Sequence, residues 1–152
     1  MRRAISVLFT ALLAIVGGLV LAPAASAATY GCSGSEIGTY PVTTSGGTNY
    51  GTIHIYYDSS TGKNCAAAVG SSAVSGKSNI YMSVTIFKCS QTSPSSSCSY
   101  VSSDPDSGYY SYYAGPVTMY SPNNCIQVGA TIRNDSIGTV ATGSSGGAKY
   151  CG

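Results

Sequence analysis

The chain has 152 residues, of which only 8% are charged, with seven Lys and Arg against five Asp and Glu. Arg2 and Arg3 account for the formal net charge of +2, so the rest of the sequence is balanced. A basic surface that would bind nucleic acid or anionic lipid is therefore not expected.

Residues 1–27 have the pattern of a secretory signal peptide. Met1-Arg2-Arg3 is followed by an apolar run from Ala4 to Leu21 and by the small residues Ala25-Ser26-Ala27. We expect cleavage after Ala27, which leaves residues 28–152 as a single all-β domain. No later apolar stretch reaches the roughly 20 residues that cross a bilayer, so no membrane attachment is expected after cleavage.

All the cysteines follow the expected cleavage site. They are Cys32, Cys65, Cys89, Cys98, Cys125 and Cys151. An even number in a short exported chain predicts a disulfide framework. Cys89 and Cys98 are close enough in the sequence to staple one hairpin or loop. For the others we prefer Cys32–Cys65 with Cys125–Cys151, so that each bond stays within one half of the chain. A Cys65–Cys125 bond is the alternative, since connectivity cannot be deduced from sequence.

Short runs of β-branched and aromatic residues, separated by clusters of Gly, Pro, Asn and Ser, predict strands throughout residues 28–152. We expect them at 36–43, 51–57, 64–69, 79–89, 98–101, 109–113, 116–120, 125–132 and 137–142. Residues 52–57 alternate cleanly, with Ile53, Ile55 and Tyr57 on one face. The predicted fold is an antiparallel β-sandwich that is stapled by disulfides, and we expect a monomer.

Several short motifs resemble the spore-associated protein A family of actinomycetes. They are Gly62-Lys63-Asn64-Cys65, Tyr112-Tyr113-Ala114-Gly115-Pro116-Val117 and the terminal Cys151-Gly152. Members of this family are small exported proteins without established enzymatic activity. The resemblance therefore implies a secreted protein at the cell wall, cell surface or spore, and it implies no reaction.

Candidate catalytic and metal-binding residues are few. His54 is the sole histidine, and we interpret it as an ordinary strand residue because no serine lies in a nucleophile-elbow motif. Glu36 is the only glutamate and is expected to stand alone. Asp104 and Asp106 flank Pro105, which favours a proline turn over a calcium loop. We predict no enzyme, no metal site and no cofactor. A hydrolase using His54 would need an acid and a serine beside it.

The tyrosines are the best functional lead. Tyr109-Tyr110-Ser111-Tyr112-Tyr113 is expected to form a strand, on which alternate rings face opposite sides. Tyr110 and Tyr112 are expected to be the more exposed pair and are the candidate ligand-binding residues, although tyrosine also fills cores as a good strand former. We predict a structural or binding protein without catalysis, whose partners are cell-wall or spore-surface components. The alternative is a small carbohydrate-binding module that recognises glycan through these two rings.

Overall fold

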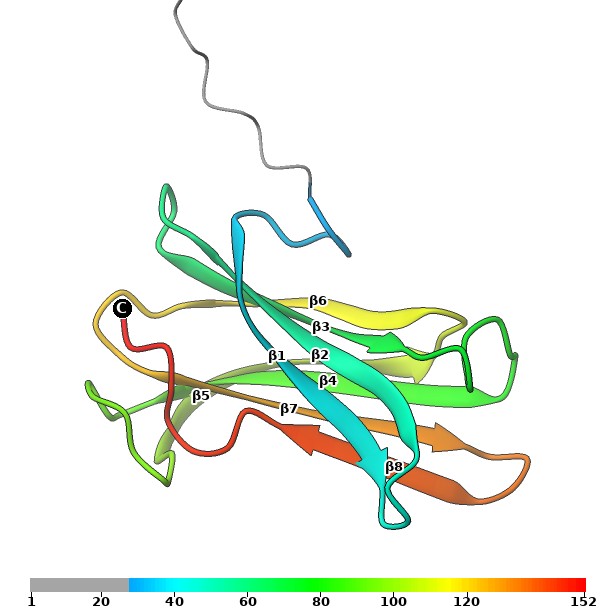
Figure 1. Cartoon of the computed structure of the whole chain (residues 1–152). Coiled ribbons are helices and arrows are strands. Elements are labelled where there is room, and N and C mark those ends of the chain that lie inside the picture. The colour runs from blue at the N-terminus through cyan, green and yellow to red at the C-terminus, as the bar shows by residue number, and fades with distance from the viewer. Residues whose placement is uncertain (1–27) are drawn as a thin grey trace, which may run out of the picture.

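The computed structural model describes residues 28–152, and the expected signal peptide, residues 1–27, lies outside them (Figure 1). The described chain forms eight strands. They are β1 (Ser35–Thr44), β2 (Asn49–Asp58), β3 (Lys63–Gly70), β4 (Ile80–Cys89), β5 (Tyr100–Tyr109), β6 (Tyr113–Tyr120), β7 (Ile126–Asn134) and β8 (Thr139–Ser144). No helix in residues 28–152 is long and apolar enough to cross a membrane.

All eight strands belong to one antiparallel sheet in the order β5-β4-β7-β8-β1-β2-β3-β6. The half that contains β1, β2, β3 and β6 crosses over the half that contains β4, β5 and β7 (Figure 1). The halves are joined where Thr43 and Thr44 of β1 pair with Thr142 and Ala141 of β8. The all-β, antiparallel prediction is confirmed. The strands form a nearly closed, barrel-like sheet rather than the two separate sheets of the predicted sandwich, because β1 continues the sheet from β8.

The core lies between the two halves and follows from the alternation of side chains along each strand. In β4, Ile80, Met82, Val84 and Ile86 are fully buried, while the residues between them face outward. β2 contributes Ile53 and Ile55 from the opposite half, as their spacing predicts. Complete burial of such a side chain stabilises the fold by about 1.5–3 kcal/mol. The core is therefore built from aliphatic residues at alternate positions.

Two aspartates close the seam between the edge strands β5 and β6. Asp104 Oδ2 accepts a hydrogen bond from the Thr118 amide, and Asp106 Oδ2 accepts one from the Gly115 amide, each at 2.7 Å. The predicted proline turn at residues 104–108 is therefore wrong, because these residues lie within β5. Pro105 is compatible with an edge strand, where its missing N–H breaks no ladder. The carboxylates supply acceptors that the edge of β6 would otherwise lack.

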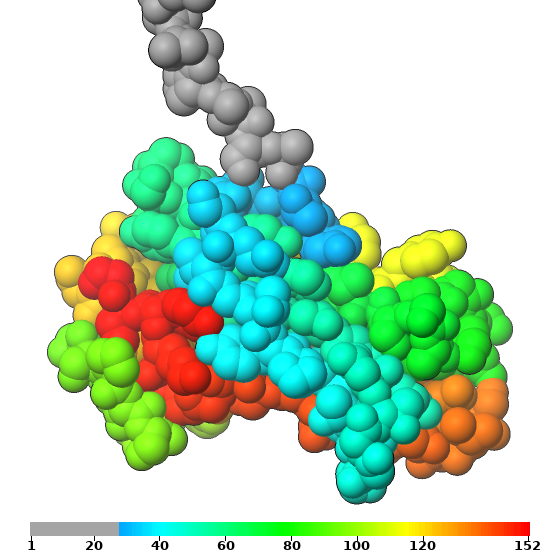
Figure 2. Space-filling model, viewed as in Figure 1, coloured from blue at the N-terminus to red at the C-terminus, as the bar shows by residue number. Residues whose placement is uncertain are grey.

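The disulfides join Cys32 to Cys65, Cys89 to Cys98 and Cys125 to Cys151. These are the pairs preferred from the sequence, and no cysteine in residues 28–152 is free. The first bond ties the N-terminal segment to β3, and the third ties the C-terminal segment to the start of β7. In Figure 2 the C-terminal segment, in red, lies against the cyan part of the chain. The hydroxyls of Tyr40 and Tyr150 hydrogen bond there at 2.8 Å.

Candidate functional site

The tyrosine run is a connection between strands and not a strand of its own. Tyr109 is the last residue of β5 and Tyr113 is the first of β6, so residues 110–112 reverse the chain. The prediction of a strand at 109–113 is therefore wrong. The high strand propensity of tyrosine is overridden, because β5 extends through residues 104–108 and the chain must turn after it to pair the seam.

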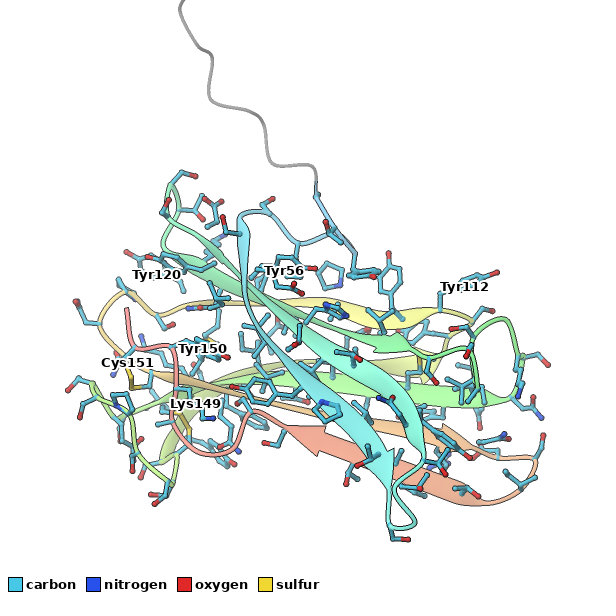
Figure 3. All side chains as sticks on the ribbon, in the orientation of Figure 1. Tyr56, Tyr112, Tyr120, Lys149, Tyr150 and Cys151 are labelled. Atoms are coloured by element: carbon cyan, nitrogen blue, oxygen red, sulfur yellow. A yellow bond between two sulfur atoms is a disulfide. The ribbon has the colours of Figure 1, made fainter. Side chains whose placement is uncertain are left out.

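The two candidate ligand-binding tyrosines have different environments. Tyr110 is half-buried, packs against the core and donates its hydroxyl to Asp106 Oδ1 at 2.8 Å. That hydrogen bond, followed by burial, raises the pKa of Tyr110. Tyr112 is 65% exposed and points away from the sheet, at the opposite end of β6 from Tyr120 (Figure 3). The expectation of two exposed rings is wrong for Tyr110, which helps to hold the seam, while Tyr112 is open to a partner.

A second group of polar and aromatic side chains surrounds His54 on the outer face of β1 and β2. His54 Nδ1 lies 2.5 Å from Glu36 Oε1, and the Tyr30 ring lies 5.2 Å from the imidazole. Tyr56 is buried beside them, and this burial, followed by the charge of Glu36, raises its pKa. The contact between Glu36 and His54 was not predicted from the sequence. Strand alternation in a hairpin of β1 and β2 was the signal that could have placed the two side chains together.

A depression of about 540 Å³ opens over the His54 group, lined by Tyr30, Ser35, Glu36, His54 and Tyr56 among others. A carboxylate at Nδ1 fixes the orientation of an imidazole, as in hydrolase triads. No serine of the described chain hydrogen bonds to His54. Within residues 28–152 no three His, Cys, Asp or Glu side chains gather where they could hold a metal ion. The geometry thus gives His54 an acidic partner, and among residues 28–152 it gives His54 no hydrogen-bonded serine.

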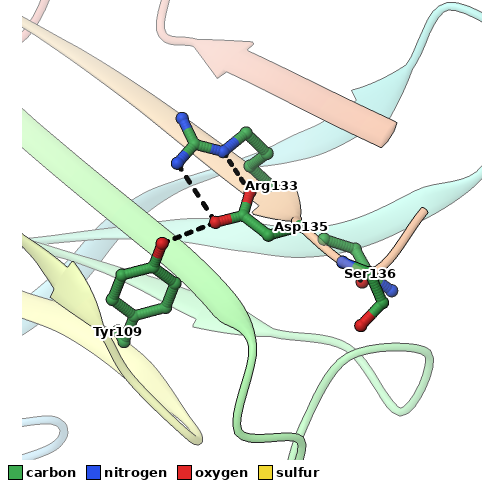
Figure 4. A network of polar contacts seen from close by, with 5 residues as sticks. Tyr109, Arg133, Asp135 and Ser136 are labelled. Carbon is green, nitrogen blue, oxygen red and sulfur yellow. Dashed lines mark hydrogen bonds and ion pairs between the residues drawn. The ribbon is translucent and has the colours of Figure 1, made fainter. Parts of the chain in front are cut away.

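Exposed aromatic rings also mark the outer face of β4, β5 and β7. Tyr100 stacks on Phe87 with ring centroids 4.4 Å apart, and its hydroxyl donates to Gln127 Oε1 at 3.3 Å. At the other end of β5, Tyr109 donates to Asp135 Oδ2 at 2.6 Å (Figure 4). Neither group was singled out from the sequence, because the positions of β5 residues depend on its pairing with β4.

Arg133 belongs to the group around Tyr109 at the end of β5. Its guanidinium forms an ion pair with Asp135 (Figure 4). The same guanidinium lies 4.7 Å from the centre of the Tyr81 ring. Hydrogen bonds from Arg133 and then from Tyr109 lower the pKa of the Asp135 carboxyl. The charge of Arg133 is therefore balanced locally.

The described residues define a small all-β protein in which three disulfides fasten both terminal segments and one loop to a nearly closed sheet. No family model and no solved structure matches the chain. The sequence is 34% identical over 140 residues to Spore-associated protein A of Streptomyces coelicolor, a match that covers 87% of this chain and 82% of the relative. The chain belongs to the Spore-associated protein A family, and the resemblance seen in its motifs is confirmed.

Proposed function

We propose that this chain is exported and acts at the surface of spores or in the cell wall as a structural or binding protein without catalytic activity. Its relation to Spore-associated protein A, which extends over most of both chains, carries the proposal. The disulfides support it, since such bonds persist in oxidising compartments outside the cytoplasm. The sequence of residues 1–27, with its charged start and apolar run, supports export.

Expression of the full chain in Streptomyces coelicolor tests this proposal. We expect the protein on washed, intact spores, and N-terminal sequencing should find it beginning at Ala28. A matched control that lacks residues 2–27 should remain in the cytoplasm. Recovery of the full chain from the cytoplasm or the medium, with none on spores, would contradict the proposal.

The proposed partners are components of the spore surface or cell wall, bound by a monomer. After loss of Arg2 and Arg3 the remaining chain has five basic and five acidic residues, which supports a partner other than nucleic acid. Sedimentation of the oxidised protein should give the mass of one chain. A stable dimer at micromolar concentration would overturn the monomer in this proposal.

The proposed absence of catalysis needs a separate test. Glu36 and His54 form the acid–imidazole pair that a small hydrolase would use. We expect the His54→Ala variant to be retained on spores to the same extent as the unaltered protein. Purified protein should release no product from ester or glycoside substrates. Hydrolysis that disappears in His54→Ala would show a catalytic role and overturn this part of the proposal.

Glycan recognition is the second candidate function, favoured by the exposed rings on the outer surface. Tyr112 and Tyr100 are 65% and 60% exposed, and an aromatic ring can stack on a sugar while its hydroxyl stays in water. Tyr110 contributes to the seam instead, so Tyr112 is the remaining member of the pair derived from the sequence. If Tyr112 binds glycan, Tyr112→Ala should weaken retention on wall material without lowering the melting temperature.

A further inference from the structure

The outward face of β5, β4, β7 and β8 presents hydroxyl side chains in aligned rows. Ser83 of β4 pairs with Thr131 of β7, and Thr131 pairs with Thr142 of β8. On the other side, Ser83 pairs with Ser107 of β5. Residues on either side of Ser83 and Thr131 in sequence are buried in the core, so these hydroxyls lie on the outside of the sheet. One row of hydroxyls therefore crosses all four strands.

A depression of about 300 Å³ lies on this face, and we call it the hydroxyl groove. Ser83, Thr85, Thr131 and Thr142 line it, and Gly129 lies opposite Thr85. The nearest atom to a Cβ added at Gly129, apart from its chain neighbours, would be the Gly143 carbonyl oxygen at 4.0 Å. The groove is open at this point because glycine has no side chain. A side chain at this position can therefore begin in the groove without a clash at its Cβ.

The hydroxyls of the groove are unused by the protein. Those of Ser83, Thr85, Thr131 and Thr142 have no hydrogen-bond partner among residues 28–152. No fully buried side-chain oxygen or nitrogen in the same range lacks a partner, so these hydroxyls are accessible to solvent. Each can donate one hydrogen bond and accept others, which matches the alternating donors and acceptors of a polyhydroxylated ligand.

Aromatic rings stand at both ends of the groove. Phe87 and the stacked Tyr100 lie at one end, and Tyr81 with Tyr109 lies at the other, their centroids 5.5 Å apart. Tyr81 and Phe87 are six positions apart on β4, which places them about 20 Å from each other along the strand. That length accommodates several sugar rings, with aromatic surfaces available to the outermost ones.

Hydrogen bonds hold the Tyr100 end in place. The Tyr100 hydroxyl donates to Gln127 Oε1, and Gln127 Nε2 donates to Ser144 Oγ, each at 3.3 Å. The chain of bonds runs from β5 through β7 to β8. Rings and amides that are already oriented lose less conformational entropy when a ligand binds.

The charges on this face favour a neutral ligand. Arg133 lies on this face beyond Thr131, and its ion pair with Asp135 leaves it no net positive charge to attract a phosphate-bearing or otherwise anionic polymer. Unpaired hydroxyls between two aromatic groups are complementary to sugar hydroxyls and ring faces.

We infer that the hydroxyl groove binds a neutral polysaccharide, with Phe87 and Tyr100 stacking on a sugar at one end and the groove hydroxyls bonding to the chain between. This inference deepens the second candidate function and rests on it, and it moves the principal site from the β5–β6 connection to the outer face of β4 and β7. Tyr112 lies outside this site.

Binding of the oxidised, exported protein to washed cellulose and chitin tests the inference. Gly129→Val fills the groove with a residue suited to strands, and we expect it to weaken binding to the better of the two polymers about tenfold. Gly46→Val is the matched control, because a Cβ at Gly46 meets only Thr44 Oγ1, at 3.8 Å, in the turn between β1 and β2. It should bind like the unaltered protein.

A second pair of variants tests the site without altering the groove floor. Tyr100→Ala removes an exposed ring from the site and should also weaken binding about tenfold. Tyr120→Ala removes a ring of similar exposure from β6 and should leave binding unchanged. The melting temperature of each of the four variants shows whether it is folded. If Gly129→Val does not fold, the binding of Tyr100→Ala tests the inference.

The outcomes separate this inference from the proposed function. Absence of binding to both polymers, or unchanged binding in both site variants, overturns the inference. Equal loss in Tyr120→Ala or Gly46→Val overturns it as well, because the effect would not belong to the groove. If the protein stays on spores but binds neither polymer, only the inference of polysaccharide binding in the groove is contradicted. A chain that binds a polymer through the groove but washes off spores contradicts the proposed spore association alone.

Discussion

Asp106 shows how much one side chain contributes to closing the sheet. One carboxylate oxygen accepts the Gly115 amide of β6 and the other accepts the Tyr110 hydroxyl. From the sequence, Asp-Pro-Asp-Ser-Gly is typical of a turn. Its position in a strand could not be predicted, because the stabilising partner is a backbone amide nine residues further along the chain. The half-burial of Tyr110 was missed for the same reason.

Asp106→Ala should destabilise the protein by about 1.5–3 kcal/mol, the usual contribution of hydrogen bonds to a charged group. Thermal unfolding monitored by circular dichroism measures the loss. Asp58→Ala is the control, because that carboxylate accepts its hydrogen bonds from Ser60 within a local turn and reaches no other strand. If the two variants melt at the same temperature, Asp106 does not hold the seam.

The Asp135 carboxyl gives a prediction for the dependence of stability on pH. Hydrogen bonds from Arg133 and Tyr109 lower its pKa from the usual 3.8 in the folded protein. The ionised group therefore stabilises the fold above that usual value, and the contribution is lost as the pH falls through the lower, folded pKa.

We accordingly expect Asp135→Asn to melt below the unaltered protein at neutral pH. The difference in melting temperature should persist down to about the usual aspartate pKa and close at lower pH. Thermal melts across this range measure it. A difference that stays constant into strong acid would show that the ionised carboxylate is not its cause.

At the scale of elements, the sequence predicts the strands whose alternation buries one face. β2 and β4 were expected near their observed bounds because their apolar residues recur at every second position. The joining of β8 to β1 was not predictable, since a short stretch of pairing between distant segments leaves no local pattern. The contact between Glu36 and His54 is intermediate in predictability, because it can be predicted once β1 and β2 are recognised as a hairpin.

The lengths of the segments that the disulfides close predict the order in which removing each bond lowers the stability. Cys32–Cys65, Cys125–Cys151 and Cys89–Cys98 close segments of 33, 26 and 9 residues. On the chain-entropy account, replacing the first pair by alanines should cost about 1 kcal/mol more than replacing the last. Denaturant unfolding of the three double variants measures the order. An order that places Cys89–Cys98 first would show that native contacts, and not loop closure, determine these contributions.

At the scale of the whole molecule, a short chain with few charges is kept folded by an aliphatic core, a carboxylate-closed seam and three disulfides. The class and the framework could be predicted from composition and cysteine spacing. The candidate binding surface could not, because the hydroxyl groove and its aromatic ends combine side chains from strands that are distant in sequence. Only the register of β4 with β5 and β7 brings Phe87, Tyr100 and Gln127 together.

The most direct test of the account is to return the purified, oxidised protein to intact spores of a Streptomyces coelicolor strain that lacks its own Spore-associated protein A. Bound protein is measured after washing, over a range of added concentrations. The account predicts saturable retention that survives washing and is abolished by prior reduction and unfolding of the protein. Retention that rises in proportion to concentration without saturating, or protein that is removed by the first wash, would contradict it.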